Sequence, residues 1–308
     1  MTEAAGPSPR LPAVDVVYTW VNGDDPDYQA LCRRYARDGA DLNPERFRDA
    51  YTLLRYSLRS LELYVPWVRH VYLFTCRPQV PAWLNRDHPR LRVVHHDEIA
   101  DPEFLPTFNC NVIESYLHRI PNPSDWLLYL NDDFLFGRAS TPLDFFAPDG
   151  RIRVFGTLLG ERFPFRVYHG RYNRISLGFI EHAPILIRKP FWEAMQQTRV
   201  AQVQSTRGHR FREDSDLRLD FLYRYYLLAC QRPWTQIVPF FSLLRVHQFH
   251  KITNHPPRQR RQLAALRRKR PIFYCLNDDQ RLSPNREVVA MVRDLLVDWY
   301  PAKSSFEL

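Results

Sequence analysis

Two neighbouring carboxylates follow an apolar run in the middle of the chain. Asp132 and Asp133 come directly after residues 126–131, whose apolar side chains predict a buried strand. Burying two ionised carboxylates is costly unless a cation, a basic partner or solvent meets them. Their oxygens are hard ligands of the kind that Mg²⁺ or Mn²⁺ prefers when it also binds phosphates. The alternative is a turn that Asn131 and Asp132 cap without any metal.

The same order of residue types recurs near the end of the chain. The short apolar run 272–276 is followed by Asn277, Asp278 and Asp279. Mg²⁺ usually takes one or two protein carboxylates together with phosphate oxygens and water, so the two clusters could share one ion. The alternative is that Asp278 and Asp279 belong to a loop before the next helix.

A histidine and two arginines are further candidates for chemistry. His182 could accept the proton of an attacking hydroxyl, because the pKa of imidazole lies near working pH; the alternative is a structural histidine. Arg210 and Arg212 would face the same way in a strand, as a fork suited to a diphosphate. The alternative for this segment is a charged loop with internal salt bridges.

Two pairs at helical spacing complete the set of candidates. Arg55 and Arg59 lie four residues apart and could hold donor phosphates or be solvated. Glu114 and His118 repeat that spacing, and they could position an acceptor or pair with each other.

Apolar periodicity predicts the elements that must position these residues. Strands are expected at 14–21, 68–75, 91–95 and 126–136, and helices at 45–64 and 111–120. Strands that alternate with helices predict an α/β fold with a mainly parallel sheet, whose ligands bind beyond the carboxyl ends of the strands. Asn22 and the cluster at 131–133 would then meet at one edge of the sheet.

The second half of the chain has fewer clear signals. A strand is expected at 151–160 and helices at 190–197, 217–229 and 283–299, the last with Ser283 as its N-cap. Residues 161–180 are rich in aromatic residues and arginine without periodicity, which predicts a loop and a candidate substrate lid.

Charge is concentrated in one segment. The 308 residues carry a formal charge of +9, and residues 251–270 hold eight Lys and Arg and no acid. The run at 256–270 could attract a polyanion or an anionic membrane face, as a peripheral contact. No recognised motif for nucleic acid accompanies it, which disfavours that partner.

Composition also indicates the compartment. The five cysteines form no CxxC pair, which suits a reducing compartment and argues against zinc. No run is long enough to span a membrane, and residues 1–12 lack the apolar core of a signal peptide. We therefore expect a cytoplasmic protein, at the inner face of the membrane if the basic run binds lipid, with a flexible leader at 1–12.

Four groups of segments, in this order, resemble a known family. They are 15–23; then 46–49, 54–60, 66–68, 105–109, 113–114, 117–118 and 129–133; then 182–184, Thr206, 210–212 and Asp216; and finally 275–278. The chain is similar to the Stealth family of sugar-1-phosphate transferases, which includes bacterial capsule polymerases and the lysosomal-enzyme N-acetylglucosamine-1-phosphotransferase. Cys110, where many relatives have Ser, and the additional Asp279 are departures that put only substrate preference in doubt.

The resemblance implies a fold and a reaction. It implies a Rossmann-like, glycosyltransferase-A-like domain over 13–300, with a nucleotide-sugar half at 13–160, an acceptor and catalytic half at 161–300 and a tail at 301–308. The enzyme would transfer a sugar 1-phosphate from a nucleotide-diphosphate sugar to a hydroxyl of an acceptor glycan, in exopolysaccharide, capsule or glycoconjugate synthesis. The alternatives are a metal-dependent glycosyltransferase that transfers the sugar alone, and a non-catalytic protein that binds polyanions.

The resemblance also implies roles for individual residues. Mg²⁺ or Mn²⁺ would be held by Asp132, Asn277 and Asp278, and catalysis would rest on His182, Arg212 and Asp133. Donor binding is expected from Trp20, Asn22, Arg55, Arg59, Asn109 and Arg210, and acceptor binding from Glu114, His118 and Asp216.

Overall fold

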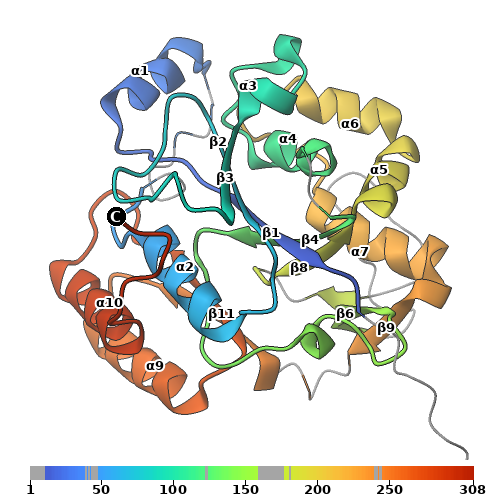
Figure 1. Cartoon of the computed structure of the whole chain (residues 1–308). Helices are drawn as coiled ribbons and strands as arrows, with labels where there is room; N and C mark the ends of the chain where they lie inside the picture. The colour runs from blue at the N-terminus through green and yellow to red at the C-terminus, as the bar shows by residue number, and fades with distance from the viewer. Residues whose placement is uncertain are drawn as a thin grey trace, which may run out of the picture.

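A five-stranded sheet runs through the centre of the molecule (Figure 1). The computed structural model describes residues 11–38, 40, 42, 48–121, 124–158, 177–179, 182–238, 242 and 245–308. The order of the central strands is β3-β2-β1-β4-β8, and only β8 runs antiparallel to its neighbour. Their bounds are β1 Val14–Thr19, β2 Val71–Thr75, β3 Leu91–His95, β4 Trp126–Asn131 and β8 Ile185–Arg188. The predicted α/β class and mainly parallel sheet are confirmed.

The strand order places a reversal at the middle of this sheet. The chain builds outward from β1 to β2 and β3 and then returns to the other side of β1 with β4. Thr19, at the end of β1, lies opposite Asn131, at the end of β4. In open α/β sheets such a reversal leaves a crevice at the carboxyl ends of the two strands, where ligands bind.

Two three-stranded sheets extend the structure. One has the order β10-β11-β5, with β10 at His247–Ile252, β11 at Phe273–Asp278 and β5 at Phe134–Phe136. The other has the order β7-β6-β9, with β7 at Leu177–Phe179, β6 at Ile152–Leu158 and β9 at Thr235–Val238. Strands β8 and β11 from the second half of the chain pair with β4 and β5 from the first. The division into two functional halves stays a prediction.

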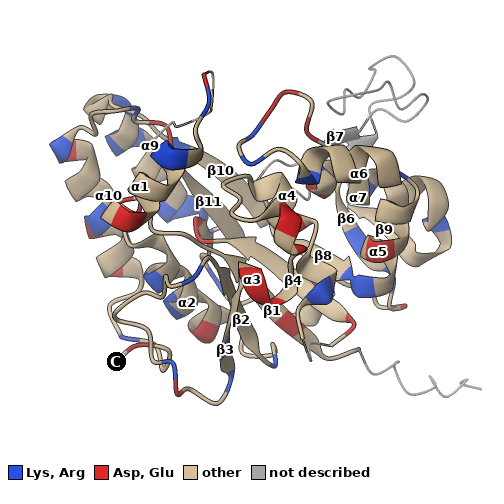
Figure 2. Cartoon of the chain, turned by 90° about the horizontal axis from the view of Figure 1, so that it is seen from above, with Lys and Arg blue, Asp and Glu red and all other residues tan. Residues whose placement is uncertain are grey.

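The helices gather mainly at the two ends of the molecule. Helices α9 and α10 lie at one end and α5, α6 and α7 at the other (Figures 1 and 2). The bounds are α1 Pro26–Tyr35, α2 Leu53–Tyr64, α3 His96–Ile99, α4 Cys110–Glu114, α5 Lys189–Gln197, α6 Val200–Arg207, α7 Leu219–Cys230, α9 Pro256–Lys269 and α10 Arg286–Trp299. None of these described helices combines the length and apolar character that crossing a bilayer requires.

The structure corrects three of the predicted elements. The strand expected at 126–136 is two strands in different sheets, β4 and β5, because Phe134–Phe136 pairs with β11 after a turn at 132–133. The helix expected at 111–120 stops at Glu114, because Gln196 and Arg207 donate hydrogen bonds to the carbonyl oxygen of Ser115, which a continuing helix would use. The last helix begins at Arg286, where Asn285 rather than Ser283 accepts hydrogen bonds from the first-turn amides.

Other boundaries differ as well. Helix α2 begins at Leu53 rather than Glu45, since Thr52 has a φ of 54° that breaks the helical path, and residues 43–47 lie outside the described residues. Strand β2 begins at Val71 rather than Val68. Of the expected loop at 161–180, residues 177–179 form β7, and the rest, with its candidate lid, lies outside the described residues. Residues 1–10 of the expected leader lie outside them too.

The basic run at 256–270 forms helix α9, which packs through Leu263 and Leu266. Figure 2 shows its Lys and Arg at the end of the molecule that α9 and α10 form. Two of these charges are paired with α10, Arg260 with Glu287 and Arg267 with Asp298, at 2.7 Å in both cases. Part of the basic excess is therefore neutralised, and contact with a membrane stays a prediction.

A buried carboxylate anchors the start of the central strand. Asp15 in β1 is 0% exposed and accepts hydrogen bonds from Arg69 Nε at 2.9 Å and from the backbone amides of His70 and Ser124. Burial alone would raise the pKa of Asp15, but the Arg69 guanidinium and these amides together hold it below its usual value. Asp15 therefore ties β1 to the segments that lead into β2 and β4.

Replacing Asp15 by Asn should lower the free energy of unfolding by about 2 kcal/mol at neutral pH, because charged hydrogen bonds are lost. A carboxyl group whose pKa is lowered by folding adds stability above its unfolded pKa, about 3.9, and loses it as pH falls through the folded value. In urea unfolding, the difference between wild type and Asp15→Asn should therefore persist at neutral pH and shrink only in acid. The exposed Asp87→Asn is the matched control, and a difference that does not change with pH would contradict this account.

Candidate active site

Two adjoining cavities open where β1 and β4 end. The smaller, which we call the switch-point cavity, has a volume of about 220 Å³ and is lined by aromatic, acidic and basic side chains that include Trp20, Arg48, Phe108, Asp132, Asp133, Asn277 and Asp278. The larger, which we call the adjoining cavity, has a volume of about 660 Å³ and is lined by residues that include Glu114, Tyr129, Arg218, Asp220 and Arg224. Both are lined by Cys110, Asn131, His182 and Arg212.

The turn between β4 and β5 carries the first acidic pair into the switch-point cavity. Burial raises the pKa of Asp132 well above its usual value, and the charges of Asp133 and Asp49 raise it further. Burial also raises the pKa of Asp133, against the effect of the nearby His182. Within the described chain, Asp133 Oδ1 is buried and accepts no hydrogen bond. Two adjacent carboxylates, one of which has a buried oxygen that accepts no hydrogen bond, are suited to binding a cation.

Pairing of β5 with β11 brings the two acidic clusters together. Phe134 lies opposite Cys275, and the amide of Leu276 donates to the carbonyl oxygen of Asp133 at 3.0 Å. The Cys275 thiol donates to Asp133 Oδ2 at 3.1 Å, and burial keeps the pKa of this thiol well above its usual value. Asn277 therefore lies next to Asp133 in space although 144 positions separate them in the chain.

The predicted metal set is only partly brought together. Arg48 Nε donates to Asp278 Oδ2 at 2.9 Å, and its Nη2 approaches the same oxygen at 2.5 Å, so a guanidinium supplies the positive charge next to this carboxylate. In the described chain, the metal-ligand atoms that cluster within 4.8 Å of one another belong to Asp133, His182 and Cys275. Asp132, Asp133 and Asn277 offer the hard oxygens that Mg²⁺ prefers, whereas the thiol and imidazole would suit a softer ion.

His182 is held rigidly beside Asp133. Its φ of 52° is a left-handed conformation that non-glycine residues rarely adopt, and such strain is often found at functional sites. The imidazole stacks on Phe249, with ring centres 4.8 Å apart, and meets the edge of Phe134. The carbonyl oxygen of His182 accepts a hydrogen bond from His247 Nε2 at 2.9 Å. These contacts fix the ring where both cavities meet.

Asn109 and Asp216 position the loop that carries Arg212. The side chain of Asn109 is 0% exposed and donates to Asp216 Oδ2 at 2.6 Å and to the carbonyl oxygen of His209 at 3.1 Å. Asp216 also pairs with His209 at 2.7 Å. The expectation that Asn109 binds the donor directly is therefore not met, because its hydrogen-bonding groups are used inside the protein.

The other predicted donor residues are divided. Trp20 lines the switch-point cavity, and its role in donor binding stays a prediction. The side chain of Asn22 instead accepts from the amide of Asp24 at 3.0 Å and closes a turn. Arg210 does not form a fork with Arg212: its Nη1 donates to the carbonyl oxygen of Pro106 at 2.7 Å, and its guanidinium lies over Tyr35.

Arg55, Arg59 and His118 lie away from both cavities. Arg59 binds Glu307 through two hydrogen bonds of 2.7 and 2.8 Å, and Arg55 lies 3.5 Å from the same carboxylate. Arg55 and Arg59 therefore bind Glu307 within the protein and do not form the phosphate site that their helical spacing suggested. The ring of His118 contacts Gln196 at 3.3 Å, and burial lowers its pKa to about 4. Among the described residues, His118 does not pair with Glu114, and it lines neither cavity.

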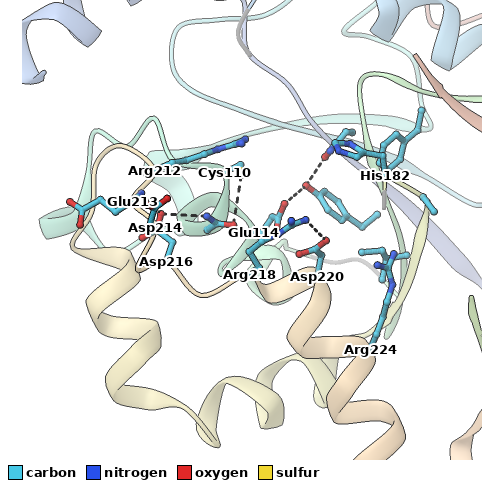
Figure 3. Close-up of a pocket in the computed structure, with 16 residues that line it drawn as sticks. Cys110, Glu114, His182, Arg212, Glu213, Asp214, Asp216, Arg218, Asp220 and Arg224 are labelled. Atoms are coloured by element: carbon cyan, nitrogen blue, oxygen red, sulfur yellow. Dashed lines mark hydrogen bonds and ion pairs between the residues drawn. The ribbon is translucent and has the colours of Figure 1, made fainter. Parts of the chain in front are cut away.

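A hydrogen-bonded row joins the adjoining cavity to the end of β4 (Figure 3). Tyr129 Oη lies 3.0 Å from Glu114 Oε1 and 2.7 Å from Asn131 Oδ1. Burial and the charge of Asp220 raise the pKa of Glu114 to about 7, and burial keeps the Tyr129 phenol protonated by raising its pKa. The Tyr129 hydroxyl is the donor in both contacts, and its single proton serves Glu114 Oε1 or Asn131 Oδ1 at any one time.

Comparison with known proteins identifies the family. Residues 12–40, 46–154, 181–229 and 264–308 match, in order, conserved regions 1, 2, 3 and 4 of the Stealth proteins. The chain belongs to the Stealth family. It is 38% identical to an exopolysaccharide phosphotransferase of Streptomyces coelicolor over 97% of this chain and 53% of that protein. It is 28% identical to the capsular polysaccharide phosphotransferase SacB of Neisseria meningitidis serogroup A over 96% of this chain and 57% of that protein.

This Stealth chain spans about half the length of these curated relatives. A second exopolysaccharide phosphotransferase of Streptomyces coelicolor is 35% identical over 96% of the chain. Among solved structures, the galactosyltransferase LgtC is similar, with 14% identity, a TM-score of 0.45, and coverage of 94% of this chain and 96% of that one.

Several residues of this Stealth site had no predicted role. Arg48 lies in one of the segments that resemble the family, but nothing in its spacing connects it to Asp278, which is 230 positions away. Cys275, which donates to Asp133, had no predicted chemical role. Asp220 and Arg224 lie four apart in the helix predicted at 217–229, and only the fold brings them to the adjoining cavity.

Replacing Arg59 by Gln should lower the free energy of unfolding by roughly 1–2 kcal/mol, because Glu307 loses two charged hydrogen bonds. The KM for a nucleotide-sugar donor should stay at the wild-type value, since Arg59 lies away from the cavities. Thermal unfolding and steady-state kinetics measure the two effects, with Glu307→Gln expected to reproduce the loss of stability. A raised donor KM at unchanged stability would restore the phosphate-binding role that the sequence suggested.

Proposed function

We propose that this protein transfers a sugar 1-phosphate from a nucleotide-diphosphate sugar to a hydroxyl of an acceptor glycan, in the synthesis of an exopolysaccharide or capsule. The observation that supports this most is the group at the cavity junction, where the buried acids Asp132 and Asp133, His182 and Arg212 meet beyond the ends of β1 and β4. The names of the curated relatives support the same reaction. The chain spans about half of the length of these relatives, so their activity is a proposal for this chain.

The reaction needs few protein groups. The acceptor oxygen attacks the phosphorus that carries the sugar, the bond from this phosphorus to the bridging oxygen breaks, and nucleoside monophosphate leaves. The product is a phosphodiester between the sugar and the acceptor. His182 takes the proton of the attacking hydroxyl, and Asp133 beside it stabilises the imidazolium that forms. Arg212 neutralises charge that spreads over the phosphoryl oxygens.

The switch-point cavity suits the donor. Trp20 and Phe108 offer aromatic faces to a base, and Arg48 and Arg212 bring positive charge to its rim. Asp132, Asp133 and Asn277 are the residues that would hold Mg²⁺ or Mn²⁺. When bound, such an ion supplies positive charge to the diphosphate.

The identity of the released nucleotide tests this proposal. Purified protein with Mg²⁺, candidate acceptors and a panel of nucleotide sugars should release nucleoside monophosphate, which mass spectrometry identifies. Asp132→Asn should lower this rate by about 10²-fold or more, because a charged group at the reacting end is lost. Asp279→Asn is the matched control, since Asp279 pairs with Lys251 at 3.1 Å. Release of nucleoside diphosphate would instead indicate a glycosyltransferase that transfers the sugar alone.

Replacing His182 by Ala should lower kcat by about 10²–10⁴-fold, the usual contribution of a general base. The donor KM should change little, because His182 contacts the attacking group rather than the nucleotide. His88→Ala provides the control, because His88 lines neither cavity and its Nε2 contacts the exposed hydroxyl of Ser305. A wild-type kcat in His182→Ala would remove His182 from the mechanism.

A further inference from the structure

The adjoining cavity is large enough for a ligand of its own. Its volume of about 660 Å³ lies within the range of about 300–1,000 Å³ that is typical of small-molecule sites. It meets the switch-point cavity at His182, Arg212 and Asn131. A group bound in it would therefore have access to the imidazole, which lines both cavities.

Two carboxyl groups from different helices face this cavity. Glu114 ends α4 and Asp220 lies in the first turn of α7, and Figure 3 shows both side chains next to Arg218. Their charges interact, since Asp220 contributes to the raised pKa of Glu114. If the two acids were purely structural, each would be expected to pair with a cationic side chain. Among the described residues, Asp220 has such a partner, since Arg218 Nη2 donates to its Oδ2 at 3.1 Å, whereas Glu114 forms no ion pair.

Each carboxyl group keeps one oxygen for a ligand. Glu114 is 7% exposed and accepts through Oε1 from Tyr129, whereas its Oε2 accepts no hydrogen bond from any residue in the described part of the chain. The same holds among the described residues for Asp220 Oδ1. Neither oxygen is among the fully buried atoms without a partner, so a ligand in the cavity that carries donors can reach both.

The signs of charge around the cavity indicate the class of ligand. Acidic and basic side chains both line it: the acids are Glu114, Glu213, Asp214, Asp216 and Asp220, and the bases include Arg212, Arg218 and Arg224. A strongly anionic group would meet the acids, and a cation would meet the arginines. Hydroxyl groups both donate and accept, so a neutral sugar satisfies the two kinds of side chain together.

On the proposed function, we infer that the adjoining cavity is the acceptor subsite, in which Glu114 and Asp220 bind hydroxyls of a neutral terminal sugar. A further hydroxyl of that sugar then lies towards His182. Asp220 is the specificity-determining residue of this subsite, since its carboxylate, held by Arg218, selects ligands that present a donor at that point.

Asp220→Asn should raise the acceptor KM by about tenfold or more, because one charged hydrogen bond is weakened, and should leave kcat at saturating acceptor near the wild-type value. Glu114→Gln should behave in the same way. Asp294→Asn, an exposed acid on α10, is the control, and circular dichroism verifies that each variant is folded.

Direct binding separates this inference from the proposed function. Saturation-transfer NMR with a panel of neutral hexoses and N-acetylhexosamines should detect sugars that bind wild-type protein and bind Asp220→Asn at least about tenfold more weakly. The result is informative even if no donor is turned over. Unchanged acceptor KM and unchanged sugar binding in both variants would overturn the inference while nucleotide release still supports the transferase. Absence of any bound sugar, or binding only of acidic sugars that depends on Arg218, would overturn it as well.

Discussion

The site depends on the burial of two adjacent carboxylates at the point where the chain leaves the central sheet. Asp132 and Asp133 fill the turn between β4 and β5, and the second of them pairs immediately with β11. Negative charge in such a place must be compensated. His182, the Cys275 thiol and the Asn277 side chain are arranged around this one requirement. The neighbouring Asp278 is compensated separately by Arg48, so the two acidic clusters have different partners although they lie side by side.

Rigidity around the acids comes from contacts that do no chemistry. His182 is fixed by the ring of Phe249 and by the hydrogen bond from His247. The loop of Arg212 is fixed by Asn109 and Asp216, whose hydrogen bonds are satisfied within the protein. Reacting groups must be held within fractions of an ångström for positioning to lower a barrier. Asn109 and Asp216, which lie in segments that resemble the family, therefore hold the site in place through contacts within the protein.

Sequence predicted most of the central sheet, because strands that are buried on both faces are continuous apolar runs, as at Val71–Thr75 and Trp126–Asn131. It also predicted that the two acidic clusters meet. It assigned Arg55 and Arg59 to the ligand wrongly, because helical spacing says which residues share a face but not what that face meets, here Glu307. It missed Arg48, because the partner Asp278 is 230 positions away and no local pattern encodes such a contact. It missed Asp220, because only the fold brings this residue to the adjoining cavity.

The pairing of β5 with β11 has a consequence for how the protein folds. The contact between Asp133 and Cys275 joins residues that are 142 positions apart, and the stacking of His182 on Phe249 requires a third distant segment. Contacts of such separation form late, after the entropy of closing long loops has been overcome. During synthesis, the central strands can pair before β10 and β11 leave the ribosome. The contacts of Asp133 with Cys275 and of His182 with Phe249 cannot form until those two strands have been made. The acids at 132–133 therefore lack their final surroundings until the last third of the chain is present.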